Sequence, residues 1–509
     1  MLRSTITKLG SIVALSGGAG TIYALHQNDY ELSNVGLIRF SRAGVAAASI
    51  IADYKYSLYN LAKDSTEYQD AIKAAHTRSA AKILRLCEKN GGVFIKVGQH
   101  IAAMEYLIPI EYTSKLCSLH SHAPVTQFEE VKKMVETNLK APLEEVFSEF
   151  DVIPVGSASL AQVHRAVIRE SGECVAVKVQ HPKVKLRSVI DMGTMEFFCR
   201  VTATFLPQFK LMWLVEETKL NLPNELDFLH EAKNADVTRR MFSHLSYLII
   251  PQIKWKYSTT EVLTMQFCEG AHINDLEYMK KEKIDAHDIC SKIGRLFSEM
   301  IFEKGYIHAD IHIGNFLVKK VNGDVKLILL DHGLYLTLKD DFRVLYSRLW
   351  LALLKPDKEE VKAISKEMGV GDLYNLFACI VTSRSWDSVQ HGIHKRKLGE
   401  KEIEQIAEYA GNLIPQISEV LSIMPREMLL ILKTNDLIRS IEHRLGVAGR
   451  ADSFIEMARF CVKSVYCEKL RKSTSYLQNF TLILTLYWRL FKIFLYTKIL
   501  LITHVTGLA

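Results

Sequence analysis

The spacing of apolar residues divides the chain into helical and extended segments. From about Leu37 to Leu139, apolar residues recur at three- and four-residue intervals, which predicts helices. The spacing changes at Pro154. Ala161–Ile168 and Cys174–Gln180 then have the composition of two strands joined by a short turn. We therefore expect a helical region followed by an antiparallel hairpin.

The later part of the chain continues this mixture. Residues 184–222 are apolar at helical spacing, which predicts an inserted pair of helices, and Glu261–Phe267 is a predicted strand. Ala286–Lys304 has the pattern of an amphipathic helix. Helical spacing returns from Lys339 to about Leu445. The chain is thus helix-rich, with its strands in two short groups.

A second predicted hairpin carries polar side chains at one end. Its strands are Phe316–Lys320 and Val325–Leu330, and the Asn322-Gly323 pair between them is a strong hairpin signal. The nearby polar residues are His308, Asp310, Asn315 and Asp331. Two carboxylates and an amide around one point are costly to assemble unless a cation lies between them. Phosphoryl transfer uses such a set, with one Asp to orient the acceptor and an Asn and a second Asp to hold Mg²⁺.

The first hairpin has features of a phosphate site. The small-residue run Gly156-Ser157-Ala158-Ser159 precedes it, and backbone amides of such a loop can lie against phosphates. Its second strand contains Val175-Ala176-Val177-Lys178, the pattern of the phosphate-contacting lysine of kinases. A buried ammonium needs a partner, for which a helical glutamate is expected. The alternative is an edge-strand lysine that reaches solvent.

Three candidate carboxylates are Glu225, Asp227 and Glu231, near a helix start that Pro223 is expected to mark. Asp227 and Glu231 are four residues apart, so on a helix they repel each other unless a cation lies between them. Glu225 is expected to point elsewhere, toward the segment of Lys96. The alternative is that these acids are favoured only by the dipole of a first helical turn.

Lys96, Gly98 and Gln99 lie in a predicted helix of the N-terminal region. Lys96 and Gln99 are three residues apart and share one face. Gly98 costs a helix roughly 1 kcal/mol relative to Ala, which suggests the close approach of another backbone or a ligand. The alternative is a surface Lys and Gln beside a loosely packed glycine.

Composition narrows the class of protein. A chain of 509 residues is expected to form about two to four structural units. Its 48% hydrophobic and 24% charged residues are typical of a globular protein. The net charge of +7 comes without a basic stripe interleaved with aromatics, so no nucleic-acid partner is expected. None of the nine cysteines forms a CxxC pair, so neither a zinc site nor a disulfide framework is expected. This pattern fits a protein of a reducing compartment.

The N-terminus has the composition of a mitochondrial transit peptide. It contains Arg3, Lys8 and several hydroxyl residues, with no acid before Asp29. The uncharged run Leu9–Asn28 is just long enough to span a bilayer. A membrane anchor, a cleaved peptide and a buried helix all remain open for this run.

The C-terminal segment Phe480–Val505 is apolar and rich in aromatics, and no acid follows Glu468. This composition resembles a membrane-surface or membrane-embedded helix. Arg489, Lys492 and Lys498 lie at different angles on a helical wheel. Packing against the rest of the protein is therefore the alternative.

Several motifs recur in one order: Lys96-x-Gly98-Gln99, Val175–Lys178, Glu225-x-Asp227, Glu231, His308-Ala309-Asp310, Asn315 and Asp331-x-Gly333. Together they resemble the UbiB/ABC1/AarF family of atypical kinases, over about Ser79 to Gly446. The resemblance implies an α+β, two-lobed protein-kinase-like fold with an N-terminal helical extension and a helical C-terminal tail. The implied parts are residues 1–30 for mitochondrial targeting or anchoring, 31–150 for the extension, 151–270 for the N-lobe with its insert 184–222, 271–446 for the C-lobe and 447–509 for a basic apolar tail.

The resemblance also implies roles in a site for ATP and Mg²⁺. Lys178 contacts the α- and β-phosphates and pairs with Glu231. Asp310 is the catalytic-loop aspartate, and Asn315 and Asp331 bind the metal. The loop Gly156, Ser157, Ala158 and Ser159 covers the nucleotide. The strand that ends near Met265 and Phe267 is where a kinase places the hinge whose backbone contacts adenine. Residues that occlude the place of a peptide substrate are Lys96, Gly98, Gln99, Glu225 and Asp227.

The family is tied to mitochondrial coenzyme Q and lipid homeostasis. It implies association with the mitochondrial inner membrane, a lipid or quinone-like ligand, protein partners and a role in membrane (cristae) organisation. Two function hypotheses follow: an ATP- and Mg²⁺-dependent atypical kinase or ATPase, and a nucleotide-binding pseudokinase that acts as a scaffold for membrane-shaping partners. No Ala-Pro-Glu motif or activation segment follows Gly333, which disfavours an ordinary protein kinase.

Three departures from the family pattern bear on activity. Ile311 and Ile313 replace both prolines of the usual HADPHPGN loop, which removes two backbone restraints. His332 replaces the usual Phe after the metal-binding aspartate. Gly156 and Ser157 replace alanines, and are expected to make the loop over the nucleotide more flexible and polar. The residues for nucleotide binding are nevertheless present.

Overall fold

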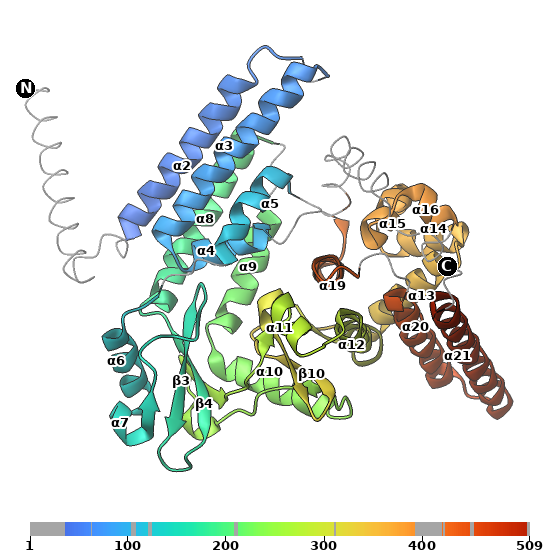
Figure 1. Ribbon diagram of the computed structural model, residues 1–509. Coiled ribbons are helices and arrows are strands. Elements are labelled where there is room, and N and C mark those ends of the chain that lie inside the picture. The colour runs from blue at the N-terminus through green and yellow to red at the C-terminus, as the bar shows by residue number, and fades with distance from the viewer. Residues whose placement is uncertain are drawn as a thin grey trace, which may run out of the picture. The chain divides into compact units, whose positions relative to one another are not determined.

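The computed structural model describes residues 36–62, 64–102, 108–120, 125–207, 212–309, 312–391, 420, 423–447 and 452–505. The chain forms two compact units. The first consists of Met1–Leu226 with Lys256–Thr264, and the second of Asp227–Trp255 with Met265–Ala509. Figure 1 labels their helices and strands.

The first unit contains a bundle of helices around one core. Its members are α2 (Gly36–Ser57), α3 (Thr66–Asn90), α4 (Val93–Ala102), α5 (Ile110–Leu116), the 3₁₀ turn Cys117–His120, α8 (Val184–Phe205) and α9 (Met212–Glu225). Helix α3 begins where the Ser65 hydroxyl accepts a hydrogen bond from Tyr68 N, and ends at Gly91 with φ of 66°. Arg39 of α2 pairs with Asp191 of α8 in the interior, with Nε 2.8 Å from Oδ1. The predicted pair of helices is thus confirmed as α8 and α9, which pack on the N-terminal helices.

The same unit contains an antiparallel sheet. Its elements are α6 (Phe128–Leu139), α7 (Leu143–Val146), β1 (Phe147–Phe150), β2 (Gly156–Ser157), β3 (Ala161–Ile168), β4 (Cys174–Gln180) and β6 (Val262–Gln266), in the strand order β1-β3-β4-β6 with β2 beside β3. Val175, Val177 and Val179 of β4 point to the face that packs against α6 and α7. Lys178 therefore points to the opposite face. The predicted hairpin is confirmed with the predicted strand limits.

The second unit is built around the other predicted hairpin. Its first elements are α10 (Phe228–Met241), β5 (Leu248–Ile249), β7 (Ala271–His272), α11 (Leu276–Lys281), α12 (Ala286–Ser298), a π-helical turn (Glu299–Lys304), β8 (Tyr306–His308), the 3₁₀ turn Ile313–Asn315, β9 (Phe316–Val321), β10 (Asp324–Leu329) and β11 (Tyr335–Thr337). The strand orders are β5-β10-β9-β7 and β11-β8. Asn322 and Gly323 have φ of 52° and 87°, as a two-residue turn with positive φ at both positions requires. The hairpin prediction is confirmed.

One predicted boundary is wrong. Pro223 does not mark a helix start but lies inside the last turn of α9, which ends at Glu225. The next helix, α10, begins after Asp227, whose carboxylate accepts a hydrogen bond from Leu229 N at 3.0 Å. An aspartate that satisfies a free amide is a strong N-cap, so Asp227 rather than the proline sets the boundary. Asp227 therefore caps the helix and does not share a helical face with Glu231.

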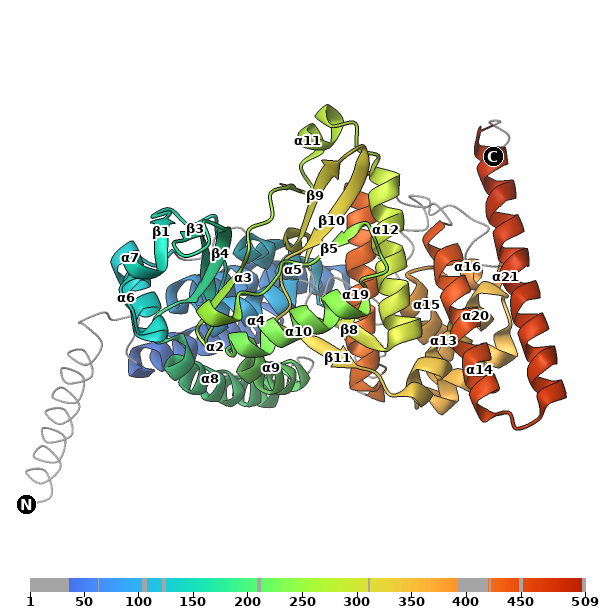
Figure 2. The same ribbon diagram turned by 90° about the horizontal axis from the view of Figure 1, so that it is seen from below.

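The end of the second unit is helical. It comprises α13 (Asp340–Leu354), α14 (Lys358–Glu367), a 3₁₀ turn (Gly371–Leu373), α15 (Tyr374–Thr382), α16 (Trp386–His391), α19 (Arg426–Arg444), α20 (Asp452–Lys472) and α21 (Tyr476–Val505). Helix α20 packs against α12 and α13, and α21 packs against α20 (Figure 2). Among the described residues, no helix combines the length and apolar character needed to cross a membrane. The predicted transit peptide, including Leu9–Asn28, lies outside the described residues.

Candidate functional site

The second unit brings Asn315 and Asp331 to the same end of the β9–β10 hairpin. Phe316 pairs with Leu329, and the Leu330 amide donates to the Asn315 carbonyl at 3.0 Å. Asn315 is buried, with 6% of its surface exposed, and Asp331 follows directly after the hydrogen-bonded residue. The backbones of these two residues therefore lie at the same end of the hairpin, as predicted, and the approach of their side chains stays a prediction.

Glu231 joins this group from helix α10. A Cβ placed on Gly333 would lie 3.3 Å from Asp331 Oδ1 and 4.0 Å from Glu231 Oε2. The Gly333 amide donates to Asp331 Oδ1 at 2.9 Å. Glu231 is 3% exposed. Two carboxylates thus converge on Gly333, and its lack of a side chain leaves the space between them open.

A buried polar network fixes the backbone of this loop, and the sequence had not indicated it. Asn234 Nδ2 donates to the His332 carbonyl at 3.0 Å, and Tyr306 donates to Asn234 Oδ1 at 2.9 Å. His308 Nε2 donates to the Asp331 carbonyl at 2.8 Å. The one available signal was spacing, because Asn234 is three residues after Glu231 and shares its helical face.

His332 takes part in the same network through its ring. Nε2 lies 3.2 Å from the Leu329 carbonyl, which only accepts, so Nε2 carries the proton. In the neutral ring Nδ1 is then an acceptor, and the Tyr335 hydroxyl donates to it at 2.9 Å. Burial raises the pKa of Tyr335, which keeps it a phenol and a donor. His332, which replaces the usual Phe, therefore forms hydrogen bonds with residues of both strands that flank the loop, β10 and β11.

The donor set around Gly333 suits Mg²⁺. This ion is commonly held by one or two carboxylates together with phosphate oxygens and water, rather than by an all-protein cage. Asn315 and Asp331 supply one amide and one carboxylate from the same end of the hairpin. Within the described ranges, no group of three or more His, Cys, Asp or Glu is arranged to hold a metal. The predicted catalytic Asp310 and the neighbouring Ile311 lie outside the described residues.

In the first unit, Lys178 and Gly156 lie on the same face of the sheet, with Val163 between them. Lys178 pairs with Val163 on β3, and Val163 pairs with Gly156 on β2. Directly opposed residues in antiparallel strands lie on the same face. A Cβ on Gly156 would meet nothing within 4 Å. The glycine therefore leaves open space on the face to which the lysine points.

The loop Gly156–Ser159 is held in place by hydrogen bonds. The Ala158 amide donates to the Ala161 carbonyl at 2.8 Å, and His181 Nε2 donates to the Ala158 carbonyl at 2.9 Å. Ser159 is buried, with 4% exposed. Gly156 and Ser157 pair with β3, so the flexibility expected from these two residues is restrained at both ends of the loop.

Gly156→Phe is expected to weaken ATP binding by about tenfold or more, because the ring would fill the space beside Lys178. The backbone of Gly156 does not have a positive φ, so the substitution introduces no strain there. Val155→Phe is the matched control, since Val155 is already 60% exposed and its side chain alternates to the other face. Calorimetric titration with ATP measures both. Equal affinities in the two variants would remove Gly156 from the nucleotide site.

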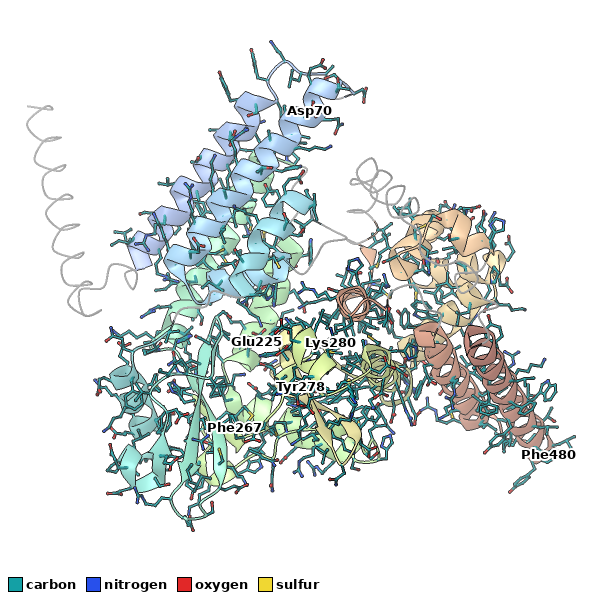
Figure 3. The ribbon with its side chains drawn as sticks, viewed as in Figure 1. Asp70, Glu225, Phe267, Tyr278, Lys280 and Phe480 are labelled. Atoms are coloured by element: carbon teal, nitrogen blue, oxygen red, sulfur yellow. The ribbon has the colours of Figure 1, made fainter. Side chains whose placement is uncertain are left out.

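Lys96 and Glu225 form an ion pair within the first unit. Lys96 Nζ lies 2.8 Å from Glu225 Oε2, with 13% and 8% of the two side chains exposed. Figure 3 marks Glu225 at the end of α9. The expectation that Glu225 points toward the Lys96 segment is confirmed. Gln99 Nε2 donates to the Leu119 carbonyl at 3.0 Å, so the surface alternative for this motif is wrong.

Gly98 permits a close approach of side chains to helix α4. A Cβ at this position would lie 2.4 Å from Leu119 Cδ1 and 3.1 Å from Cys87 Sγ. Leu119 and Cys87 are 1% and 3% exposed, so neither can move into solvent. A close approach to Gly98 is therefore confirmed, but the prediction that a backbone or a ligand makes it is wrong, because the neighbours are the side chains of Leu119 and Cys87.

Gly98→Ala is expected to destabilise the first unit by about 1–3 kcal/mol through overpacking, which exceeds the gain in helix propensity. Gly193→Ala is the matched control: Gly193 is also helical, and its Cβ would meet nothing within 4 Å. The melting temperature should fall for Gly98→Ala and stay level or rise for Gly193→Ala. The packing explanation fails if both substitutions shift it in the same direction.

The remaining candidates fall on both units. Met265 is buried in β6, and Phe267 follows that strand (Figure 3). Lys178 belongs to the first unit and Glu231 to the second, so their pairing stays a prediction. The occluding role of Lys96, Gly98, Gln99, Glu225 and Asp227 likewise stays a prediction.

Comparison with known proteins identifies the family. Residues 118–365 match the ABC1 atypical kinase-like domain. The chain is 45% identical to AarF domain-containing kinase 1 of Drosophila melanogaster, over 92% of this chain and 90% of that protein. It is 44% identical to AarF domain-containing protein kinase 1 of Xenopus laevis (93% and 91% covered) and of Mus musculus (93% and 90% covered). The predicted α+β kinase-like fold with a helical C-terminal region is thereby confirmed, and the chain belongs to the ABC1/AarF family of atypical kinases.

Proposed function

We propose that the protein is an ATP- and Mg²⁺-dependent atypical kinase or ATPase of a mitochondrial membrane, with a role in lipid and coenzyme Q homeostasis and in cristae organisation. The observation that carries the proposal is the convergence of Asp331 and Glu231 on Gly333, at the end of the hairpin where the Asn315 backbone also lies. Kinases use an Asn and an Asp for Mg²⁺, and a Glu that pairs with the phosphate-contacting lysine. Lys178 would be that lysine.

Each residue would have a defined task with ATP bound. Mg²⁺ would neutralise negative charge on the β- and γ-phosphates. Asn315 and Asp331 would hold it, and Lys178 would hold the α- and β-phosphates. Asp310 would orient the attacking hydroxyl or water. The network from Asn234 to His332 holds the Asp331 backbone still, so these groups need little reorganisation.

A nucleotide-binding scaffold is the second candidate. It is favoured by the two isoleucines in the catalytic loop. Ile313 packs against the apolar core of the second unit, and His312 accepts a hydrogen bond from Gly314 N at 3.1 Å. This loop is thus restrained differently from one that contains two prolines, and a turnover-deficient protein could retain nucleotide binding.

Nucleotide binding and turnover, measured separately, test both candidates. The full-length protein is titrated with ATP with and without Mg²⁺, and phosphate release is followed with and without lipid vesicles or a quinone analogue. Binding with turnover supports the enzyme. Binding without turnover under every lipid condition supports the scaffold, and absence of ATP binding both with and without Mg²⁺ overturns both candidates.

The mitochondrial location rests on residues 1–30, and is tested without the rest of the protein. A reporter fused to these residues should enter mitochondria, because their basic, acid-free composition is that of a transit peptide. The same fusion with Arg3→Glu and Lys8→Glu is the control. A cytosolic reporter in the unmodified fusion would contradict this part of the proposal.

A further inference from the structure

Helix α21 presents a continuous apolar surface to solvent. Its exposed apolar and aromatic residues on one side are Tyr476, Leu477, Phe480, Ile483, Leu484, Tyr487, Trp488, Phe491, Phe494 and Leu495, with exposures between 42% for Ile483 and 93% for Tyr476. Tyr496, 40% exposed, lies outside this side. At 3.6 residues per turn the residues of this side occupy an arc of about 140° along the helix. We call this arc the α21 apolar face. Figure 3 marks Phe480 near its beginning.

Part of the opposite side of α21 is covered by α20. Figures 1 and 2 show α20 and α21 side by side, and in the described part of the chain α20 is the element with which α21 packs extensively. Leu482, Leu486 and Leu490, spaced four residues apart on that side, are partly buried. The Arg489 guanidinium lies 5.4 Å from the centre of the Tyr466 ring of α20. Among the described side chains, the α21 apolar face is thus the side of the helix turned away from α20.

The position of α20 fixes that orientation. Arg471 of α20 pairs with Asp340 at 2.8 Å, and Arg343 of α13 donates to the Ser464 hydroxyl at 3.4 Å. Phe460, Cys461 and Val462 are buried. Because α20 is anchored to the second unit, the α21 apolar face stays turned outward.

The basic residues around the α21 apolar face indicate which kind of partner it binds. No Asp or Glu follows Glu468, whereas Arg489, Lys492 and Lys498 are basic. The Lys492 ammonium lies 5.2 Å from the centre of the Trp488 ring, at the border of the face. A second copy would bring like charges together across large aromatic side chains, with no carboxylate in the segment to pair with them. Anionic lipid headgroups would pair with these cations, and Tyr and Trp rings favour the boundary between acyl chains and water.

We propose that α21 docks in the plane of an anionic lipid bilayer, with the α21 apolar face in the boundary between headgroups and acyl chains. The inference rests on the proposed membrane association and gives it a place in the fold. It does not depend on nucleotide turnover. Lys492, and the basic residues near it, would contact the headgroups while α20 holds the kinase-like unit at the surface.

Flotation of the full-length protein with vesicles tests this docking. The probes are phosphatidylcholine vesicles with and without phosphatidylglycerol, at low and high salt. We expect binding to the anionic vesicles that weakens with salt, and at least about tenfold weaker binding for Tyr487→Ser/Trp488→Ser/Phe491→Ser. Val152→Ser/Ile153→Ser/Val155→Ser is the matched control, since these residues are 60–81% exposed outside α21. Trp488→Phe should keep binding and lose the quenching of Trp488 fluorescence by brominated lipid.

Three results would overturn the inference. They are binding of the α21 triple variant equal to that of the control, equal binding to vesicles with and without phosphatidylglycerol, and a vesicle-free dimer that only the α21 variant converts to monomer. The first would leave membrane association in place through another segment. ATP affinity of the triple variant should equal that of the wild type, so a failure of docking and a failure of the proposed enzyme are told apart.

Discussion

Asp331→Asn is expected to reduce Mg²⁺-dependent ATP turnover by roughly 10²-fold or more, with little effect on the fold. The substitution removes the negative charge that would hold the metal but keeps Oδ1, which accepts the hydrogen bond from the Gly333 amide at 2.9 Å. The loop is also held by His308 and Asn234 through backbone carbonyls, which the substitution does not touch. The effect should therefore appear in turnover and in Mg²⁺ dependence, and not in the melting temperature.

A matched control lies on the same hairpin. Asp324, whose side chain is 79% exposed, begins β10 at the end away from the site, so Asp324→Asn changes the same charge in the same element. Phosphate release is measured for both variants over a range of Mg²⁺, and with the metal removed by a chelator. Wild-type turnover in Asp331→Asn would exclude a metal-dependent role for this site. A loss shared by Asp324→Asn would show that only the fold is affected.

Short sequence patterns were sufficient to predict the β9–β10 hairpin and the residues at its end. The Asn322-Gly323 pair set the register of the hairpin, because only such residues readily adopt positive φ at both turn positions. The hairpin then carried Asn315 and Asp331 to one end without any long-range information. The direction of Glu225 toward Lys96 was also predicted, although Glu225 ends α9 and does not lie in a helix that starts at Pro223.

Contacts between residues far apart in the sequence could not be predicted from such patterns. Tyr306, His332 and Tyr335 became one network with Asn234 only because β8 pairs with β11 and α10 lies beside both. No spacing rule links residues about 70–100 positions apart. Pro223 gave a wrong helix boundary for a related reason. Both a proline and a capping aspartate can mark a helix start, and here the hydrogen bond from Leu229 N to the Asp227 carboxylate sets the start of α10.

Lys96→Met is expected to destabilise the first unit by roughly 3–5 kcal/mol, because it leaves the Glu225 carboxylate buried without this partner. Lys96→Met combined with Glu225→Leu should recover most of the loss, since replacing both partners by apolar residues removes the buried charge. Lys256→Met is the control: Lys256 pairs with Glu170 at the surface, both side chains are 67% exposed, and no change in melting temperature is expected. A loss in the double variant equal to the sum of the single losses would show that the pair is not coupled.

The same substitution is expected to weaken ATP binding, because the ion pair is connected to the strand of Lys178. Glu225 is followed by Leu226, whose carbonyl accepts a hydrogen bond from Gln180 Nε2 at 2.9 Å. Gln180 is two residues after Lys178 on β4 and points to the same face. Loss of the pair frees the end of α9 and thereby the support beneath that face. Titration of Lys96→Met with ATP below its melting temperature checks this, and an affinity equal to that of Lys256→Met would confine the role of the Lys96 motif to stability.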